Sequence, residues 1–195
     1  MVARMSVALR QPMTLDEFLA WEERQELRWE LDGIQRFAVT GGTVEHERIG
    51  RNIPVSVRTR LPGRRCQALG ENLKIEVAGR IRYPDAFAVC TPVPPRSTVV
   101  RDPVAVLEVL SDSTAHTDHF HKLREYGATP PIQRHVLLEQ DRIEATVYVR
   151  KGTDLVVETL TAADTLRMPE VGVEVPMTEF STDVDLTDQA AAQAE

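Results

Sequence analysis

A single carboxylate interrupts an otherwise aliphatic run between Val104 and Leu110. The run has the length and the β-branched composition of a buried strand. Glu108 is the only charged residue in it. Burying a carboxylate costs several kcal/mol unless the group is paired, hydrogen-bonded or bound to a cation. Glu108 therefore predicts either a buried ion pair or a metal site within a sheet.

A second carboxylate stands at the entrance of another apolar run. The sequence Arg-Tyr-Pro-Asp at 82–85 continues as Ala-Phe-Ala-Val-Cys, and we expect one strand from Arg82 to Cys90. Pro84 cannot donate a ladder hydrogen bond, so it belongs at the entrance or edge of this strand. Asp85 then opens the buried part of the strand. The alternative, common for a Pro-Asp pair, is that Asp85 only caps a turn.

A helix is expected after residues 111–114, which are all types that cap helices. It ends at Gly127, with two prolines shortly beyond. Asp118, Lys122 and Tyr126 are spaced four residues apart and therefore share one helical face. Two carboxylates on neighbouring strands and a lysine on the following helix suit metal-dependent hydrolysis of a phosphodiester.

Each of these residues also has a purely structural explanation. Lys122 is placed to form a solvated salt bridge with Asp118, one helical turn away. The alternative for Glu108 is a buried arginine partner such as Arg82. Because Asp85, Glu108 and Lys122 occur together in this arrangement, a functional site is favoured over three unrelated structural roles.

Length and composition describe one globular domain. The chain has 195 residues, of which 42% are hydrophobic and 27% charged, as in ordinary globular proteins. We expect residues 1–180 to form a single domain and residues 181–195 to form a disordered tail. The tail carries acids without bases: Asp183, Asp185, Asp188 and Glu195. No apolar run approaches the roughly 20 residues that span a bilayer, so we expect no membrane partner.

The charge distribution leaves the question of a nucleic-acid partner open. A net charge of −7 argues against one. However, residues 48–65 contain arginines and no acid: Arg48, Arg51, Arg58, Arg60, Arg64 and Arg65. Such a cluster is either a solvated helix face with its loop or a phosphate-binding surface.

The cysteines and histidines do not predict a metal centre. Cys66 and Cys90 have no metal-ligand spacing, and we expect two buried, reduced thiols, which fits the cytoplasm. His116 and His119 share a helical face, but His121 does not, and no cysteine is near. A structural zinc site is therefore not expected.

The remaining chain predicts short elements around this centre. A first helix begins at Thr14, with Glu17 in capping-box spacing, and runs to about Leu27 or Arg28. Residues 29–39 predict two short strands turned at Asp32-Gly33. A second helix runs from Thr43 to about Leu61, with a kink expected at Pro54. Further strands are expected around 135–138, 143–149 and 155–160.

Taken together, these motifs resemble the Uma-two family of restriction-endonuclease-like proteins in the PD-(D/E)XK nuclease superfamily. The similarity spans roughly Thr14 to Phe180. It is carried by residues 29–33, by His46 with Ile49, Asn52 and Ile53, by residues 83–85, by residues 107–111 with 113–114, and by Asp118, Lys122 and Tyr126.

The resemblance implies an α/β (α+β) fold with a restriction-endonuclease-like core. This core is a mixed central β-sheet flanked by helices, with additional β-strands in the C-terminal half. It also implies that Asp85 and Glu108 bind Mg²⁺ or Mn²⁺. The superfamily's lysine usually lies two residues after the second carboxylate, where this chain has Leu110. The family is thought to take the lysine from the next helix, which here is Lys122.

Other roles follow from the same resemblance. Glu30 would extend the metal sphere or hold a second metal. His46 would touch the scissile phosphate or orient Glu30, and Asp118 and Tyr126 would support the substrate or the ligands. Asp112 stands where the family commonly has proline.

The implied function is a metal-dependent endonuclease acting on DNA, as a homodimer by analogy with enzymes that cut both strands. The alternatives are a catalytically inactive module that binds nucleic acid or protein, and a small-molecule phosphohydrolase.

Overall fold

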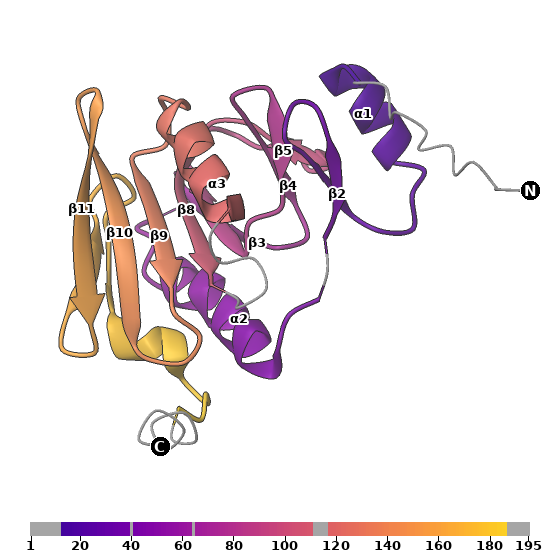
Figure 1. Ribbon diagram of the computed structural model, residues 1–195. Coiled ribbons are helices and arrows are strands. Elements are labelled where there is room, and N and C mark those ends of the chain that lie inside the picture. Colours follow the sequence, from indigo (N-terminus) through magenta and orange to yellow (C-terminus); the bar gives the residue numbers. More distant parts are fainter. Residues whose placement is uncertain (1–12, 40, 64, 111–116, 187–195) are drawn as a thin grey trace, which may run out of the picture.

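The computed structural model describes residues 13–39, 41–63, 65–110 and 117–186 (Figure 1). Three α-helices, thirteen strands and a 3-10 helix follow one another in this part of the chain. In order they are α1 (Leu15–Glu22), β1 (Trp29–Leu31), β2 (Arg36–Ala38), α2 (Val44–Arg58), β3 (Gln67–Gly70), β4 (Lys74–Val77), β5 (Arg80–Arg82), β6 (Ala86–Val89), β7 (Val99–Val100), β8 (Pro103–Val109), α3 (Thr117–Gly127), β9 (Arg134–Leu138), β10 (Glu144–Lys151), β11 (Asp154–Thr161), β12 (Thr165–Met168), β13 (Val173–Pro176) and η1 (Met177–Ser181).

The central sheet has six strands in the order β11-β10-β9-β8-β6-β3. It is mixed, because β8 and β9 run parallel while the other neighbours are antiparallel. Helices α2 and α3 cover opposite faces of it (Figure 1). Ile49 and Ile53 of α2 share a core with Leu107, whereas Tyr126 of α3 packs with Phe87 and Val106. The expected mixed sheet between helices is confirmed.

A second sheet, in the order β2-β1-β5-β4-β7, lies beside the first. The expectation of one continuous strand from Arg82 to Cys90 is wrong. Arg82 ends β5 in the second sheet, and Ala86 begins β6 in the central sheet. The chain crosses between sheets here because Pro84 has no N–H, while the N–H of Tyr83 donates to a Glu30 carboxylate oxygen at 2.7 Å.

The predicted starts of the first two helices are confirmed, and their predicted ends lie too far along the chain. Thr14 and Glu17 form the capping box of α1, and the Thr43 hydroxyl caps α2. Helix α1 ends at Glu22, whose buried carboxylate accepts hydrogen bonds from Lys74 and from the Tyr83 hydroxyl. Helix α2 ends at Arg58 with Pro54 inside it. The strands turned at Asp32-Gly33, the strand at 134–138 and the C-terminal strands are also present.

The expectation of two reduced thiols is also wrong. Cys66 and Cys90 form a disulfide between the ends of β3 and β6. The register of these strands, which pairs Gln67 with Val89, brings the two cysteines face to face. Their 24-residue separation gave no sign of this pairing. The cytoplasmic location loses the support that it took from reduced thiols.

The C-terminal part of the described chain packs against α2. Asn52 of α2 donates hydrogen bonds to the carbonyl oxygens of Phe180 and Thr182 at 3.0 and 2.8 Å. Most of the predicted acidic tail falls on residues 187–195, outside the described residues. Within the described ranges, no helix combines the length and the apolar character needed to cross a membrane.

Candidate active site

Two strands of the central sheet bring Asp85 and Glu108 together. Strands β6 and β8 are antiparallel, and Ala86 lies opposite Leu107. Continuing this register by one residue places Asp85 alongside Glu108. The two carboxylates are close enough for the charge of Glu108 to act on Asp85. The predicted pairing of two carboxylates from neighbouring strands is therefore present.

Helix α3 supplies two partners to Glu108. The Lys122 ammonium lies 3.1 Å from one Glu108 oxygen, and the Tyr126 hydroxyl donates to the other at 2.5 Å. Both reach the same carboxylate because they are one helical turn apart. Burial by itself raises the pKa of Glu108, but Lys122, His135 and the two hydrogen bonds outweigh it and lower that pKa to about 2. Glu108 is therefore ionised at neutral pH.

The phenol of Tyr126 acts only as a donor in this arrangement. It is fully buried, and burial together with the Glu108 charge raises its pKa well above the ordinary value. The side chain of Asp118, predicted on the same helical face, lies outside the described residues.

Asp85 is held differently, at the end of the sheet nearest to α2. One of its oxygens accepts a hydrogen bond from the backbone N–H of Val109 at 2.7 Å and lies 3.7 Å from His46 Nε2. Burial raises the pKa of Asp85 to about 6, with the Glu108 charge adding to the rise and His46, Val109 and Lys122 opposing it. Two adjacent carboxylates thus have pKa values on opposite sides of the ordinary range.

Glu30 is close to this centre but has other partners. One of its oxygens accepts from the N–H of Tyr83, and the other lies 3.3 Å from the Arg82 guanidinium. Burial raises its pKa, while the charges of Lys122 and Arg82 act against the rise. Arg82 pairs with Glu30 and Glu125, so the alternative of an Arg82–Glu108 pair is not what the structure has. The metal-binding role of Glu30 stays a prediction.

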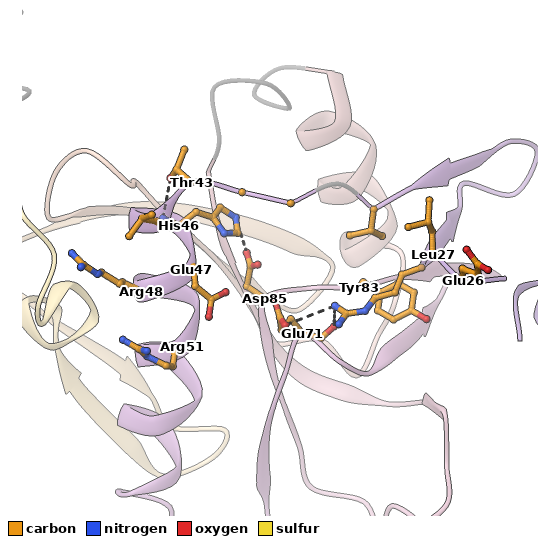
Figure 2. A pocket seen from close by; sticks show the side chains of 15 residues that line it. Glu26, Leu27, Thr43, His46, Glu47, Arg48, Arg51, Glu71, Tyr83 and Asp85 are labelled. Carbon is orange, nitrogen blue, oxygen red and sulfur yellow. Dashed lines mark hydrogen bonds and ion pairs between the residues drawn. The ribbon is translucent and has the colours of Figure 1, made fainter.

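A cavity of about 820 Å³ opens beside Asp85 and His46 (Figure 2). Figure 2 shows His46 and Glu47 pointing toward Asp85, while Arg48 and Arg51 point away from it. Three glutamates and three arginines line it: Glu26, Glu47, Glu71, Arg28, Arg48 and Arg51. Of the arginine cluster at 48–65, two members therefore border the cavity, whose wall has mixed rather than basic charge.

The donor set fits a hard divalent cation. Mg²⁺ and Mn²⁺ prefer oxygen ligands and keep several waters, so two carboxylates suffice beside a substrate phosphate. A bound cation would also offset the repulsion between the two carboxylates, which adds to the burial that raises the pKa of Asp85. No cluster of three or more His, Cys, Asp or Glu side chains able to hold a metal occurs among the described residues.

Comparison with known proteins identifies the family. A family model described as "Putative restriction endonuclease" matches residues 15–178, most of the chain. The chain belongs to the Uma2 family. Membership supports a nuclease as its general function.

Two other proteins are similar to this Uma2 chain. "Uncharacterized protein slr1290" of Synechocystis is 29% identical over 188 residues, covering 94% of this chain and 96% of that protein. The crystal structure of a "putative nuclease belonging to DUF820" from Anabaena variabilis has a TM-score of 0.73 at 17% identity. It covers 88% of this chain and 98% of that chain, so the two share the restriction-endonuclease-like fold.

The sequence did not indicate two features of this Uma2 site. The backbone N–H of Val109 holds Asp85, and a sequence pattern carries no signal for such a contact. The buried pair between Arg82 and Glu125 was also missed. The sequence held one weak sign of this pair: Arg82 lies three residues before Asp85, and Glu125 lies three residues after Lys122.

Proposed function

We propose that this Uma2 protein is a metal-dependent endonuclease that hydrolyses DNA phosphodiester bonds. The observation that carries the proposal is the arrangement of Asp85, Glu108 and Lys122, in which neighbouring strands supply two carboxylates and the next helix a lysine 3.1 Å from one of them. Metal-assisted phosphodiester hydrolysis needs anionic oxygen ligands and a positive donor beside them.

Each residue has a separate role. Asp85 and Glu108 bind Mg²⁺ or Mn²⁺, which when bound lowers the pKa of a coordinated water and neutralises phosphoryl charge. Lys122 orients the attacking water or stabilises the negative charge of the transition state. Tyr126 holds the Glu108 oxygen that does not face Lys122, so that the carboxylate keeps one orientation. Glu30 and His46 are proposed to extend the ligand sphere and to contact the scissile phosphate, respectively.

Cleavage of plasmid and single-stranded DNA tests the proposal. Wild-type protein is expected to cut in Mg²⁺ or Mn²⁺ and to stop when the metal is chelated. A preparation of Glu108→Gln purified identically serves as the blank, because contaminating nuclease would survive in it. Absence of both cleavage and calorimetric metal binding would instead favour the inactive module that binds nucleic acid or protein. Cutting of nucleotides but not of polymer would point to a phosphohydrolase.

The two unlike carboxylates predict how metal binding depends on pH. Asp85 must lose its proton to bind a cation, and its pKa is raised to about 6, whereas Glu108, at about 2, stays ionised. Metal affinity should therefore be nearly constant above pH 7 and fall about tenfold between pH 7 and pH 5. Calorimetric titration with Mn²⁺ at several pH values measures this. An affinity unchanged down to pH 5 would show that Asp85 either keeps an ordinary pKa or is not a ligand, and Asp85→Asn, which weakens binding only if Asp85 is a ligand, separates the two.

A further inference from the structure

The most deeply buried charge near the site belongs to Arg82, whose side chain is 1% exposed. Its guanidinium donates to both oxygens of Glu125, each at 2.7 Å. A third donor faces Glu30 at 3.3 Å. Arg80 also lies 3.1 Å from Glu125. The Arg82 guanidinium therefore binds two carboxylates, Glu125 and Glu30, which come from two different elements.

Arg82, Glu125 and Glu30 come from the elements that build the site. Arg82 ends β5, three residues before Asp85. Glu125 lies on α3, directly before Tyr126 and one turn after Lys122. Glu30 comes from β1, which pairs with β5. The Arg82–Glu125 pair thus joins the segment that delivers Asp85 to the helix that delivers Lys122 and Tyr126.

Stability alone does not explain such a network. Desolvation offsets most of the attraction in a buried ion pair, and well-packed apolar residues often replace it without loss. What a bidentate pair adds is orientation, because the planar guanidinium fork meets a carboxylate in one geometry. Lys122 and Tyr126 must both reach Glu108 from α3, so the angle of this helix over the sheet decides whether they do.

We propose that Arg82 is a positioning residue, which acts through Glu125 to hold α3 so that Lys122 and Tyr126 meet Glu108. Glu30, on β1, accepts a hydrogen bond from the remaining nitrogen of the same Arg82 guanidinium. The catalytic consequence rests on the proposed nuclease function. The position of the Lys122 ammonium can be tested whether or not the protein is a nuclease.

The test compares Glu125→Gln with a matched control, Glu170→Gln. Glu170 pairs with Arg134 at 2.9 and 3.3 Å, and this pair is also buried, with side chains 6% and 10% exposed. Both substitutions neutralise the carboxylate of a buried arginine pair, but only one lies on α3. Thermal unfolding of each variant measures the general loss of stability, and Arg82→Lys replaces Glu125→Gln if the latter does not fold.

Two readouts separate positioning from stability. In Glu125→Gln, kcat for DNA cleavage should fall at least about tenfold while Mn²⁺ affinity stays within about threefold, because Asp85 and Glu108 remain. Acylation of Lys122, followed by mass spectrometry with exposed Lys151 as the reference, should become several-fold faster. Glu170→Gln should change neither.

Unchanged kcat and unchanged Lys122 labelling in Glu125→Gln would overturn the proposal. The same losses in Glu170→Gln would also overturn it, since they would be effects of stability alone. If the wild type cuts no DNA, the nuclease function fails, and the labelling of Lys122 alone then decides on the positioning role.

Discussion

Glu108→Gln is expected to lower the rate of DNA cleavage by at least about 10³-fold and to abolish measurable Mn²⁺ binding. A metal ligand supplies several kcal/mol of transition-state stabilisation, and 4 kcal/mol corresponds to about 10³ in rate. Glutamine keeps the shape and the acceptor for Tyr126 but removes the charge that the cation needs. Cleavage kinetics and calorimetry measure the two effects.

The same substitution should also weaken the fold, and this has to be separated from chemistry. The pKa of Glu108 is lowered from 4.5 to about 2, so the ionised carboxylate stabilises the folded state at neutral pH, and this contribution shrinks as the pH falls below 4.5 and is lost once it has fallen through about 2. Neutralising it leaves Lys122 facing an uncharged group, at a cost of about 2 kcal/mol. Glu170→Gln is the control. If Glu108→Gln still binds Mn²⁺ and cuts DNA at a rate near that of the wild type, Glu108 is not a ligand.

The parts of the site that the sequence predicted are those set by local periodicity. A lone carboxylate within an aliphatic strand marked Glu108, because burial without compensation is too costly. A spacing of four residues placed Lys122 and Tyr126 on one helical face, and both do contact Glu108. These inferences needed only the geometry of one strand and one helix.

The parts that the sequence did not predict depend on how distant segments pair. Arg82 and Glu125 are 43 residues apart, and only the crossing from β5 to β6 puts them in contact. Treating residues 82–90 as one strand hid that crossing, because an apolar run does not show which sheet each residue joins. The Cys66–Cys90 bond was missed for the same reason, since it follows from the register of β3 and β6.

Lys122→Met is expected to lower the rate of DNA cleavage by about 10²-fold to 10³-fold while leaving metal binding intact. Methionine is similar in length to lysine and keeps the packing of the side chain, but it has no charge and no donor for a water or a phosphoryl oxygen. Because Lys122 lies 3.1 Å from Glu108 and competes with a cation for that carboxylate, Mn²⁺ affinity should stay the same or increase slightly. Loss of cleavage with metal binding retained distinguishes Lys122 from Glu108, whose substitution should remove both DNA cleavage and Mn²⁺ binding.

Two further variants make the role of Lys122 specific. Lys122→Arg keeps the positive charge but replaces a compact ammonium by a bulky planar group, so it should recover little of the lost rate. Lys151→Met removes an exposed lysine at the end of β10 and should cut like the wild type. Full activity in Lys122→Met would show that the lysine only balances the charge of Glu108. The chemistry would then need a different positive group, and Arg82 could not supply it while it is held by Glu30 and Glu125.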